Sequence, residues 1–381
     1  MPCTKIVLSA LKITCYTIVA VCFITAATAQ KSKLVEGVIN KEAILSDLDA
    51  YARGIADNHV HPFNAIKKKD FFAKIEEIKN TYTQYNIDVM LIKWLQVNAL
   101  IGDEHTNIGY ESIVRDRIPL NCYWFKEGIY ITGTMANDLT HLYFRIIAVN
   151  NTPITESRNS AIFTIINLKG DTSKITTTPI DKRDARLLRG FDKESFLRMS
   201  VRGSYGFKYI DSGHFIYFRY ASCKEDTAHP FKDFEAKLIS ETKRPGRNKI
   251  IIDMRDNRGG SPRMLEPFID YLNTSPLNRK GAIYVLTGRK TFSAAILNSV
   301  YLKNQTRAII AGEETSGSVA HYGFIKQIKL PATRLTFTYS TQYVVTNERY
   351  DGSLQPDVLI PETFADYSTG VDAALNYAIT H

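Results

Sequence analysis

Apolar side chains recur every three or four residues in three segments near the start of the chain, residues 41–51, 70–82 and 89–100. In the first segment, Ile44, Leu48 and Tyr51 fall on one face. This spacing is typical of amphipathic helices, which bury one face and leave the other in water. We therefore expect a helical region over residues 30–107.

The pattern then changes to one that favours strands. Residues 118–200 are rich in Thr, Ile, Tyr and Asn, and short stretches such as IYITGT alternate between apolar and polar positions. Alternation with a period of two indicates strands that bury one face. Asn150 and Asn151 add a turn signal. We expect a small β-rich module over residues 108–205, and nothing in it resembles a reacting group.

Beyond Gly213, strand patterns alternate with helix patterns. The succession is HFIYFRY, a helical stretch over residues 230–239, the apolar run KIIIDM, a second helical stretch over residues 261–272, and the run AIIAG. Such alternation predicts an α/β layer. We assign this layer to residues 206–381.

Two of its strand-to-helix turns carry candidate chemistry. KIIIDM leads into Gly259 and Gly260, and two glycines allow backbone N–H groups to turn towards a ligand, whereas a plain turn needs one. Ser261 and Pro262 then suit the N-cap and first position of a helix. In the second turn, Ser293 stands between an apolar strand and an apolar-faced helix. A serine there is ordinarily an N-cap, but the same place suits a nucleophile.

The first 29 residues differ from the rest. Lys5 and Lys12 supply positive charge, residues 13–25 form an apolar run, and Ala27 and Ala29 precede Gln30. This combination predicts a cleavable signal peptide over residues 1–29. Because the run is shorter than a membrane span requires, we expect a periplasmic or secreted protein with no stable membrane span.

Charge and composition narrow the class further. Loss of Lys5 and Lys12 with the leader lowers the formal charge from +9 to +7. The remaining basic residues are scattered apart from residues 67–69, and no nucleic-acid-binding motif accompanies them. Scattered charge without a motif is typical of a solvated surface, so no nucleic acid partner is expected.

Metal and disulfide chemistry find little support in the sequence. His59 and His61 could face one way on a strand, but no third ligand is near and Pro62 favours a loop. Outside the leader only Cys122 and Cys223 remain, which permits one disulfide without predicting it. We expect no metal and no cofactor. His105, in a turn beside a carboxylate, is a candidate base, although a lone histidine is usually structural.

Four short motifs follow one another along the chain: Asp253-Met254-Arg255-x-Asn257-x-Gly259-Gly260, Thr291-Phe292-Ser293-Ala294-Ala295, Gly312-Glu313-Glu314-Thr315-x-Gly317 and Gln355-Pro356-Asp357. Each is weak alone, but their order resembles the tail-specific (C-terminal processing) serine proteases and their tricorn-core relatives. The resemblance implies an α/β core like that of ClpP and crotonase, built of repeated strand-strand-helix units. A PDZ-like module often accompanies that core.

The resemblance also implies site residues. Ser293 of the TFSAA motif becomes the nucleophile. One branch of the family takes its base from a lysine at the position of Glu314, and a carboxylate cannot serve in that role. The tricorn-like Ser-His branch instead takes a histidine from an upstream turn similar to Gly102-Asp103-Glu104-His105-Thr106, which points to His105.

The remaining parts of the implied site are an acid and an oxyanion hole. The acid lies shortly before the Pro-Asp motif in that branch, and Asp351 is our choice, with Glu348 second. The backbone N–H of Gly259 or Gly260, together with that of Ala294, would form the oxyanion hole. The expected function is an exported serine-type peptidase that acts on peptides or unfolded proteins, in an oligomeric state that the sequence does not define.

Three other functions fit parts of the pattern. A non-catalytic exported binding protein on the same fold is one. A crotonase-like enzyme acting on acyl-thioesters is another, although the leader argues against it because coenzyme A thioesters are cytoplasmic. An esterase with the same triad is the third.

Overall fold

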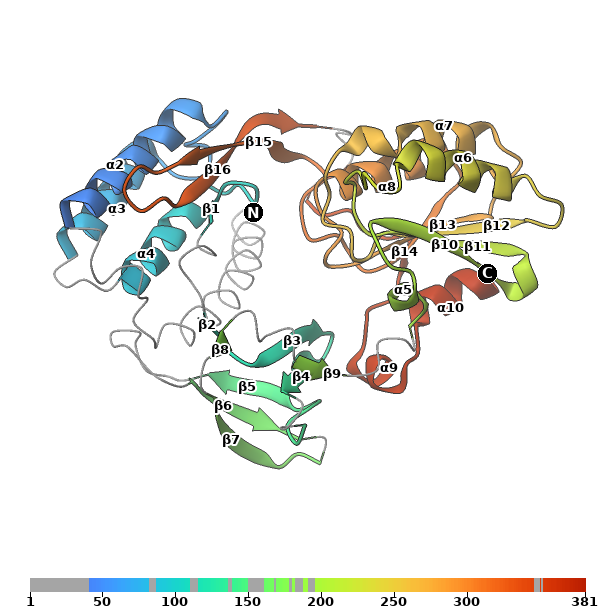
Figure 1. Cartoon of the computed structure of the whole chain (residues 1–381), viewed down its shortest axis with the longest axis horizontal. Helices are drawn as coiled ribbons and strands as arrows, with labels where there is room; N and C mark the ends of the chain where they lie inside the picture. The colour runs from blue at the N-terminus through green and yellow to red at the C-terminus, as the bar shows by residue number, and fades with distance from the viewer. Residues whose placement is uncertain are drawn as a thin grey trace, which may run out of the picture. The chain divides into compact units, whose positions relative to one another are not determined.

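The structure is a computed structural model of the 381-residue chain. It describes residues 41–81, 87–109, 116–135, 139–149, 161–167, 169–177, 180–181, 188–190, 196–345, 350 and 352–381. The predicted signal peptide, Glu348 and Asp351 lie outside these residues. The chain divides into two compact units (Figure 1). Unit 1 is Met1–Tyr123, Gly128–Gly190 and Tyr322–Tyr343, and unit 2 is Trp124–Glu127, Phe191–His321 and Val344–His381.

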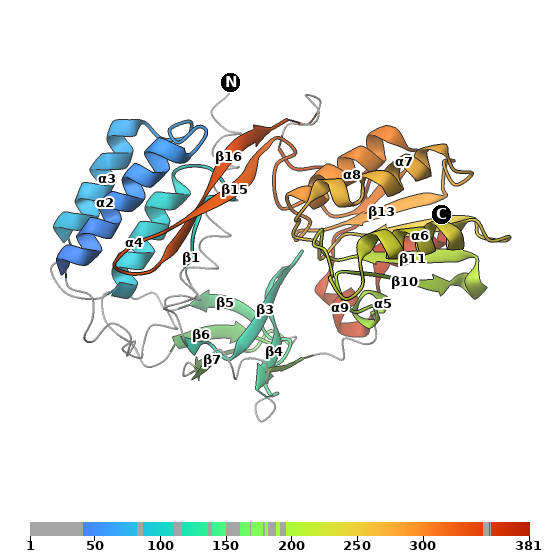
Figure 2. The same cartoon turned by 45° about the horizontal axis from the view of Figure 1, so that its top comes forward.

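Unit 1 contains the three predicted helices, which are confirmed as α2 (Lys41–Asn58), α3 (Lys68–Thr81) and α4 (Ile87–Ala99). They share a core with a three-stranded sheet in the order β1 (Asn107–Gly109), β16 (Thr336–Val344), β15 (His321–Lys329). Figure 2 shows the long β15–β16 hairpin beside these helices. Tyr51 lies at the centre of the core, with its ring 5.2 Å from that of Trp94 and 5.1 Å from that of Phe337. This hairpin comes from the stretch that the sequence assigns to the α/β layer.

The predicted β-rich module is also present in unit 1. Its main sheet has the order β3 (Leu120–Phe125), β4 (Gly128–Met135), β5 (Arg145–Val149), β6 (Ala161–Ile166), β7 (Thr172–Thr177), with β9 (Leu188–Gly190) paired to β4. A separate ribbon joins β2 (Asp116–Arg117) and β8 (Ile180–Asp181). The β4–β5, β5–β6 and β6–β7 pairs are antiparallel, as hairpin connections require.

Unit 2 is built on one six-stranded sheet. Its order is β10 (Tyr205–Ile210), β11 (Phe215–Tyr220), β12 (Lys249–Asp253), β13 (Ile283–Thr287), β14 (Ile309–Gly312), β17 (Val358–Leu359). β10 is antiparallel to β11, and the strands from β11 to β17 are parallel. Its helices are α5 (Leu197–Ser200), α6 (Phe231–Thr242), α7 (Glu266–Thr274), α8 (Ala294–Gln305), α9 (Phe364–Thr369) and α10 (Ala373–Thr380), with short 3-10 turns η4 (Asp211–Gly213) and η5 (Pro262–Met264).

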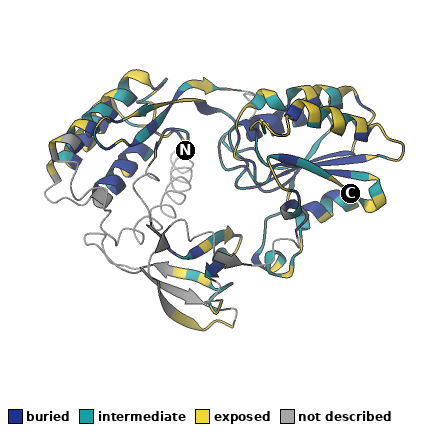
Figure 3. Ribbon diagram, viewed as in Figure 1, coloured by how far each residue is buried: buried dark blue, intermediate teal, exposed yellow. Residues whose placement is uncertain are grey.

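Both faces of this sheet are covered, which explains why its strands read as unbroken apolar runs. Ile250 and Ile252 pack in a core that includes residues of α6, α7 and α8. Ile251 and Tyr284 pack on the opposite side with residues of α10. Figure 3 shows the central strands of unit 2 buried between the helices. The predicted α/β layer is therefore confirmed.

Parallel strands place their carboxyl ends at one edge of the sheet. β12 leads to the Gly259-Gly260 turn, β13 to the Ser293 turn and β14 to Glu313 and Glu314. In open α/β sheets this edge is where ligands bind. The topology thus brings the motifs of the α/β layer to the edge at which a site is expected.

Candidate active site

Ser293 stands at the junction between the loop after β13 and the first residue of α8, Ala294. Its φ of 53° and ψ of −125° depart from the extended conformation of an ordinary N-cap, and its side chain makes no capping hydrogen bond. A non-glycine residue at positive φ is strained, and such strain gathers at functional sites. Ser293 occupies the cap position without acting as a cap, so its conformation needs another explanation.

Most backbone polar groups of the Gly259-Gly260 turn have hydrogen-bond partners within the protein. The Gly259 N–H donates to Asn257 Oδ1 at 2.8 Å. The Gly259 carbonyl accepts from the Cys223 N–H at 3.1 Å, and the Ser261 N–H donates to the Cys223 carbonyl at 2.8 Å. Within the described part of the chain, no hydrogen bond involves the Gly260 N–H. Of the two glycine N–H groups, that of Gly260 is therefore the one outside the network of the turn.

The two turns touch each other. A Cβ on Gly259, whose φ is 97°, would lie 2.8 Å from Ser293 Cβ and 3.1 Å from Ala294 N. The Phe292 N–H also donates to the Asn257 carbonyl at 3.0 Å. Glycine is required at position 259 because only a residue without a side chain allows this approach. The structure thus brings Ser293, Ala294 and Gly259 together.

Gly260 has its own reason to be glycine. Its φ is 139°, and a Cβ there would collide with the Cys223 carbonyl. Cys223 and Gly260 form a parallel β-bridge that continues from the end of β11. Both glycines are needed, which favours a specialised turn over a plain strand-to-helix connection.

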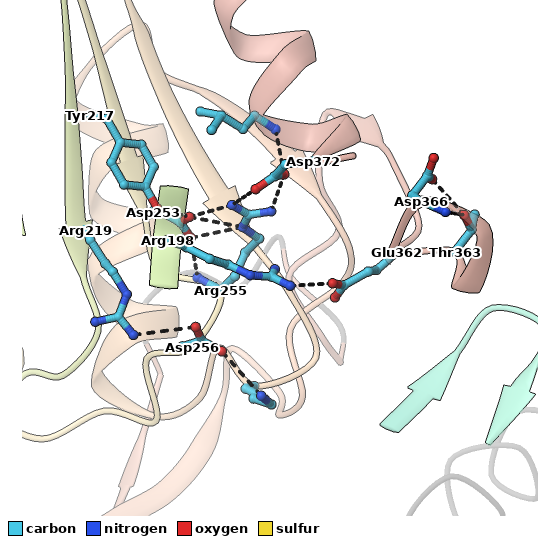
Figure 4. A network of polar contacts seen from close by, with 12 residues as sticks. Arg198, Tyr217, Arg219, Asp253, Arg255, Asp256, Glu362, Thr363, Asp366 and Asp372 are labelled. Atoms are coloured by element: carbon cyan, nitrogen blue, oxygen red, sulfur yellow. Dashed lines mark hydrogen bonds and ion pairs between the residues drawn. The ribbon is translucent and has the colours of Figure 1, made fainter. Parts of the chain in front are cut away.

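A buried charged network fixes the beginning of the loop after β12 (Figure 4). Arg255 bridges two carboxylates, with 2.6 Å from Nη2 to Asp253 Oδ2 and 2.6 Å from Nη1 to Asp372 Oδ1. The Tyr217 hydroxyl donates to Asp253 at 2.6 Å. Burial alone would raise the pKa of Asp253, but the Arg255 charge and these hydrogen bonds lower it to about 2. Asp372 also caps α10 through the Leu375 N–H, so the network ties the loop to the helix on the opposite face.

A second ion pair joins the two turns at their outer ends. Lys290 Nζ lies 3.3 Å from Asp256 Oδ1, and Arg219 Nη2 lies 3.6 Å from Asp256 Oδ2. Burial raises the pKa of Asp256, but the charges of Lys290 and Arg198 outweigh it and hold that pKa below its usual value. The lysine nearest to Ser293 in sequence is therefore charge-paired. Glu314, at the position that holds a lysine in one branch of the resembled family, accepts a hydrogen bond from Gln355 at 2.9 Å.

His105 belongs to unit 1, where one carboxylate organises its turn. Asp103 accepts hydrogen bonds from the His105 backbone N–H at 2.8 Å and from the Thr106 hydroxyl at 2.5 Å. The imidazole Nε2 of buried His59 lies 3.0 Å from Asp103 Oδ2. Burial would raise the pKa of Asp103, but the hydrogen bonds from His59, Thr106 and the His105 backbone keep it below its usual value.

The Asp103 carboxylate also lies beside the ring of the candidate base, His105. Asp103 Oδ1 lies 3.9 Å from His105 Nδ1. In the sequence this carboxylate stands beside His105 without any direct sign of its role. The available signal was the spacing: an Asp two residues before a His accepts the backbone N–H of that His in an Asx-turn.

The histidine pair considered for metal binding has another arrangement. His59 Nδ1 accepts the His61 backbone N–H at 3.0 Å while Nε2 faces Asp103, so both ring nitrogens of His59 are engaged. Across the described ranges no group of three or more His, Cys, Asp and Glu side chains could hold a metal ion. Cys122 and Cys223 are free thiols.

A hollow of about 340 Å3 opens beside His105 in unit 1. It is lined by Glu104, His105, Asn107, Gly109, Gln327, Thr336 and Thr338. Loss of hydration, and then the charge of Asp103, raises the pKa of Glu104 to about 7 although the residue as a whole stays exposed. The Thr338 hydroxyl donates to the His105 carbonyl at 2.7 Å, which links the turn to β16.

The predicted site is thus divided between the two units. Ser293, Ala294, Gly259 and Gly260 lie in unit 2 and His105 lies in unit 1, and each half is described by itself. The two candidate acids, Asp351 and Glu348, fall outside the described residues. None of the helices in the described ranges is both long and apolar enough to cross a membrane.

Comparisons with known proteins give a fold. A scan against protein-family models finds no match, and a search of curated proteins finds none. Among solved structures, mature CPAF complexed with lactacystin is 12% identical with a TM-score of 0.60, over 89% of this chain and 97% of that chain. A candidate peptidase from Parabacteroides merdae ATCC 43184 is 16% identical with a TM-score of 0.51, over 87% of this chain and 94% of that one.

The tricorn protease is 17% identical with a TM-score of 0.52, over 89% of this chain and 36% of that much longer chain. At these identities a likeness shows the fold alone. This chain therefore has the mixed α/β fold of mature CPAF and of the matched part of the tricorn protease, in agreement with the tricorn-like resemblance of its motifs.

Proposed function

We propose that this protein is a serine-type peptidase in which Ser293 is the nucleophile and His105 the base. The observation that carries the proposal is the backbone of Ser293, held at φ 53° at the start of α8 without a capping hydrogen bond. A serine that only capped the helix would be extended and would accept a backbone N–H. The strained alternative is the geometry that exposes a nucleophile at a strand-to-helix turn.

The chemistry follows from these groups. His105 takes the proton as Ser293 Oγ forms a bond to the scissile carbonyl carbon, and the carbonyl oxygen becomes an oxyanion. The C–N bond then breaks and His105 gives the proton to the leaving amine. Water, deprotonated by the same histidine, releases the acyl group and restores Ser293.

The oxyanion donors are the backbone N–H groups of Gly260 and Ala294. Of the residues predicted for this role, Gly259 already donates its N–H to Asn257 at 2.8 Å, so Gly260 takes its place. The N-terminus of α8 adds partial positive charge at the same point, since its first N–H groups have no partner within the helix. Loss of one such donor typically costs roughly a hundred- to thousand-fold in rate.

The finer features of the proposal come from the sequence. Asp351, with Glu348 as the alternative, completes the triad by orienting His105. Unit 2 is a ClpP/crotonase-like core and the β3–β9 module is PDZ-like, with domain boundaries near residues 30–107, 108–205 and 206–381. A signal peptide over residues 1–29 exports the protein to the periplasm or beyond, where peptides or unfolded proteins are its substrates.

The direct test is covalent labelling. A fluorophosphonate probe reacts with an activated serine, whose Oγ displaces fluoride from phosphorus. We expect the probe to label the protein at Ser293, and we expect the labelled protein to stop hydrolysing an unfolded protein substrate. Labelling without any peptide cleavage, but with cleavage of a simple ester, would favour an esterase. Absence of both labelling and hydrolysis would favour a binding protein.

A further inference from the structure

We propose that Asn257 is a positioning residue that holds the Gly260 N–H towards the oxyanion. This inference rests on the proposed function, because it concerns the same oxyanion donor. Asn257 touches neither the nucleophile side chain nor a substrate position. It acts through the backbone of the Gly259-Gly260 turn.

Asn257 is the point at which three segments meet. It is completely buried, at 0% exposure. Its Nδ2 donates to the Tyr220 carbonyl at the end of β11 at 2.9 Å, and its Oδ1 accepts the Gly259 N–H at 2.8 Å. Its own carbonyl accepts the Phe292 N–H at 3.0 Å, one residue before Ser293. One side chain and its backbone thus connect β11, the glycine turn and the Ser293 turn.

The hydrogen bond to Gly259 decides which N–H is left for a ligand. A peptide N–H turned inwards fixes the plane of that peptide and limits the next one. The Gly259 N–H is bonded to Asn257, and the Gly259 carbonyl and the Ser261 N–H are both bonded to Cys223, so these three groups of the turn have partners inside the protein. Gly259 is buried and its N–H is already paired, whereas Gly260 is exposed, so the Gly260 N–H is the glycine donor that remains for an outside acceptor.

At neutral pH an amide side chain meets both requirements of this position. The site needs a donor for the Tyr220 carbonyl and an acceptor for the Gly259 N–H on one uncharged side chain. A carboxylate of the same shape supplies acceptors alone and adds a negative charge behind the developing oxyanion. An aliphatic residue supplies neither and leaves both backbone groups unpaired.

A structural role alone predicts a different outcome, and a neighbour provides the control. Asn298 on α8 is also completely buried, and its Nδ2 contacts Cys223 Sγ at 3.7 Å rather than a backbone group of the glycine turn. Asn257→Ala and Asn298→Ala both remove a buried amide from the same cluster. A purely structural amide would lower stability in both variants and leave the kinetics of the folded enzyme unchanged.

The experiment compares these variants in the full-length protein, with rates expressed per folded molecule. We expect Asn257→Ala to lower kcat roughly 100-fold, the size of a small misplacement in an active site, with KM for a peptide substrate within about threefold of wild type. We expect Asn298→Ala to keep kcat within about threefold. The rate of fluorophosphonate labelling should fall in parallel with kcat, since the phosphonyl oxygen uses the same donors.

Asn257→Asp adds a test that does not depend on the alanine variant folding. When protonated, an aspartic acid can donate to the Tyr220 carbonyl and accept from Gly259, so this variant should recover kcat as the pH falls, relative to wild type at the same pH. Equal losses in kcat for the Asn257 and Asn298 variants, or no pH-dependent recovery in Asn257→Asp, would overturn the inference while leaving the peptidase proposal intact. A wild-type protein that neither hydrolyses peptides nor reacts with the probe would overturn the peptidase proposal itself.

Discussion

Around Ser293 the chain is held by backbone hydrogen bonds and two glycines, whereas around His105 it is held by one buried carboxylate. In unit 2, the Gly259-Gly260 turn forms main-chain hydrogen bonds with Cys223, and the neutral side chain of Asn257 accepts the Gly259 N–H. In unit 1, Asp103 accepts bonds from the His105 backbone, the Thr106 hydroxyl and the His59 ring.

The difference follows from what each turn must present. A nucleophile and its oxyanion donors require fixed backbone positions. Main-chain hydrogen bonds and glycines supply these within the Gly259-Gly260 turn, and ion pairs hold the start of its loop. A base requires a proper ring orientation and proton affinity, which a nearby carboxylate influences through its charge. We therefore expect the Gly259-Gly260 turn to be disrupted by added side-chain bulk, and the His105 turn to be disrupted by removal of the Asp103 charge.

The largest effect should come from removing either chemical group. We expect Ser293→Ala and His105→Ala each to lower kcat for peptide cleavage by roughly 10⁴-fold or more, because the serine is inert without its base. Thermal stability should change little. The double variant should be hardly slower than either single one, because the pair acts as a unit.

Steady-state kinetics on an unfolded protein or a fluorogenic peptide measure this. Additive losses in the double variant would mean that His105 and Ser293 act independently, so that the base lies elsewhere. Full hydrolysis by Ser293→Ala would make the non-catalytic binding protein the better interpretation. Thermal scans of all three variants serve as the folding control.

The next effect tests the carboxylate of the His105 turn. We expect Asp103→Asn to lower kcat/KM roughly 100-fold and the free energy of unfolding by about 1–3 kcal/mol, because buried partners are left poorly paired. Asp49→Asn is a matched control, since Asp49 also lies in unit 1 but forms a half-exposed pair with Lys79 at 2.9 Å. That change should cost under about 1 kcal/mol. Unchanged kinetics in Asp103→Asn would show that the turn does not need this charge.

The steric side of the comparison can be tested with glycines. Gly260→Ala should lower the free energy of unfolding by about 2–4 kcal/mol, because φ is 139° and the new Cβ collides with the Cys223 carbonyl. Gly170→Ala is the control: its φ is 94°, but nothing lies within 4 Å of the added Cβ. Chemical denaturation measures both. Equal costs would mean that the collision is relieved and that only the backbone conformation matters.

How far the sequence could predict this structure depends on the range of each signal. Periodicity predicts α2, α3 and the strands of unit 2, because each signal lies within one segment and reports which face is buried. It gives no sign that the β15–β16 hairpin packs with α2 and α4, because its partners lie more than 200 positions away in the chain. Pairing across such a separation is decided by the shared core around Tyr51 and Phe337, which local patterns do not encode.

The site shows the same limit. The motifs predict Ser293, Gly259, Gly260 and Ala294 as candidate site residues. The sequence could not tell which glycine N–H is free, because that depends on the orientation of the Asn257 side chain in the folded protein. Asp103 was visible beside His105, but its burial and its contact with His59 arise only when residues 44 positions apart come together.

A smaller effect concerns the stability of unit 2 at acidic pH. The pKa of Asp253 is lowered to about 2, and those of Asp256 and Asp372 are also lowered. A lowered carboxyl pKa contributes stability that is present above the unfolded value near 4 and is lost as the pH falls through the folded value. Unit 2 should therefore lose stability between about pH 4 and pH 2, by about 2 kcal/mol for Asp253 alone.

Denaturant titrations across this range measure the slope of stability against pH. Asp253→Asn should be less stable than wild type at pH 7 and should show a shallower slope. A slope that this variant leaves unchanged would mean that Asp253 does not carry the acid sensitivity. The carboxylates of unit 1, where the pKa of Asp103 is also lowered, would then be the next candidates.

The smallest expected effect concerns whether unit 2 can supply its own base. Glu314 stands where a lysine would act in the other branch, is half-buried and accepts one hydrogen bond from Gln355. We expect Glu314→Lys to change kcat/KM by less than about threefold and stability by less than about 0.5 kcal/mol, as for a surface substitution. In a His105→Ala background it should restore no peptide cleavage, because the base is then absent from unit 1. Restored cleavage in that double variant would show that the Ser293 turn works with a base from its own unit, and the role assigned to His105 would have to be withdrawn.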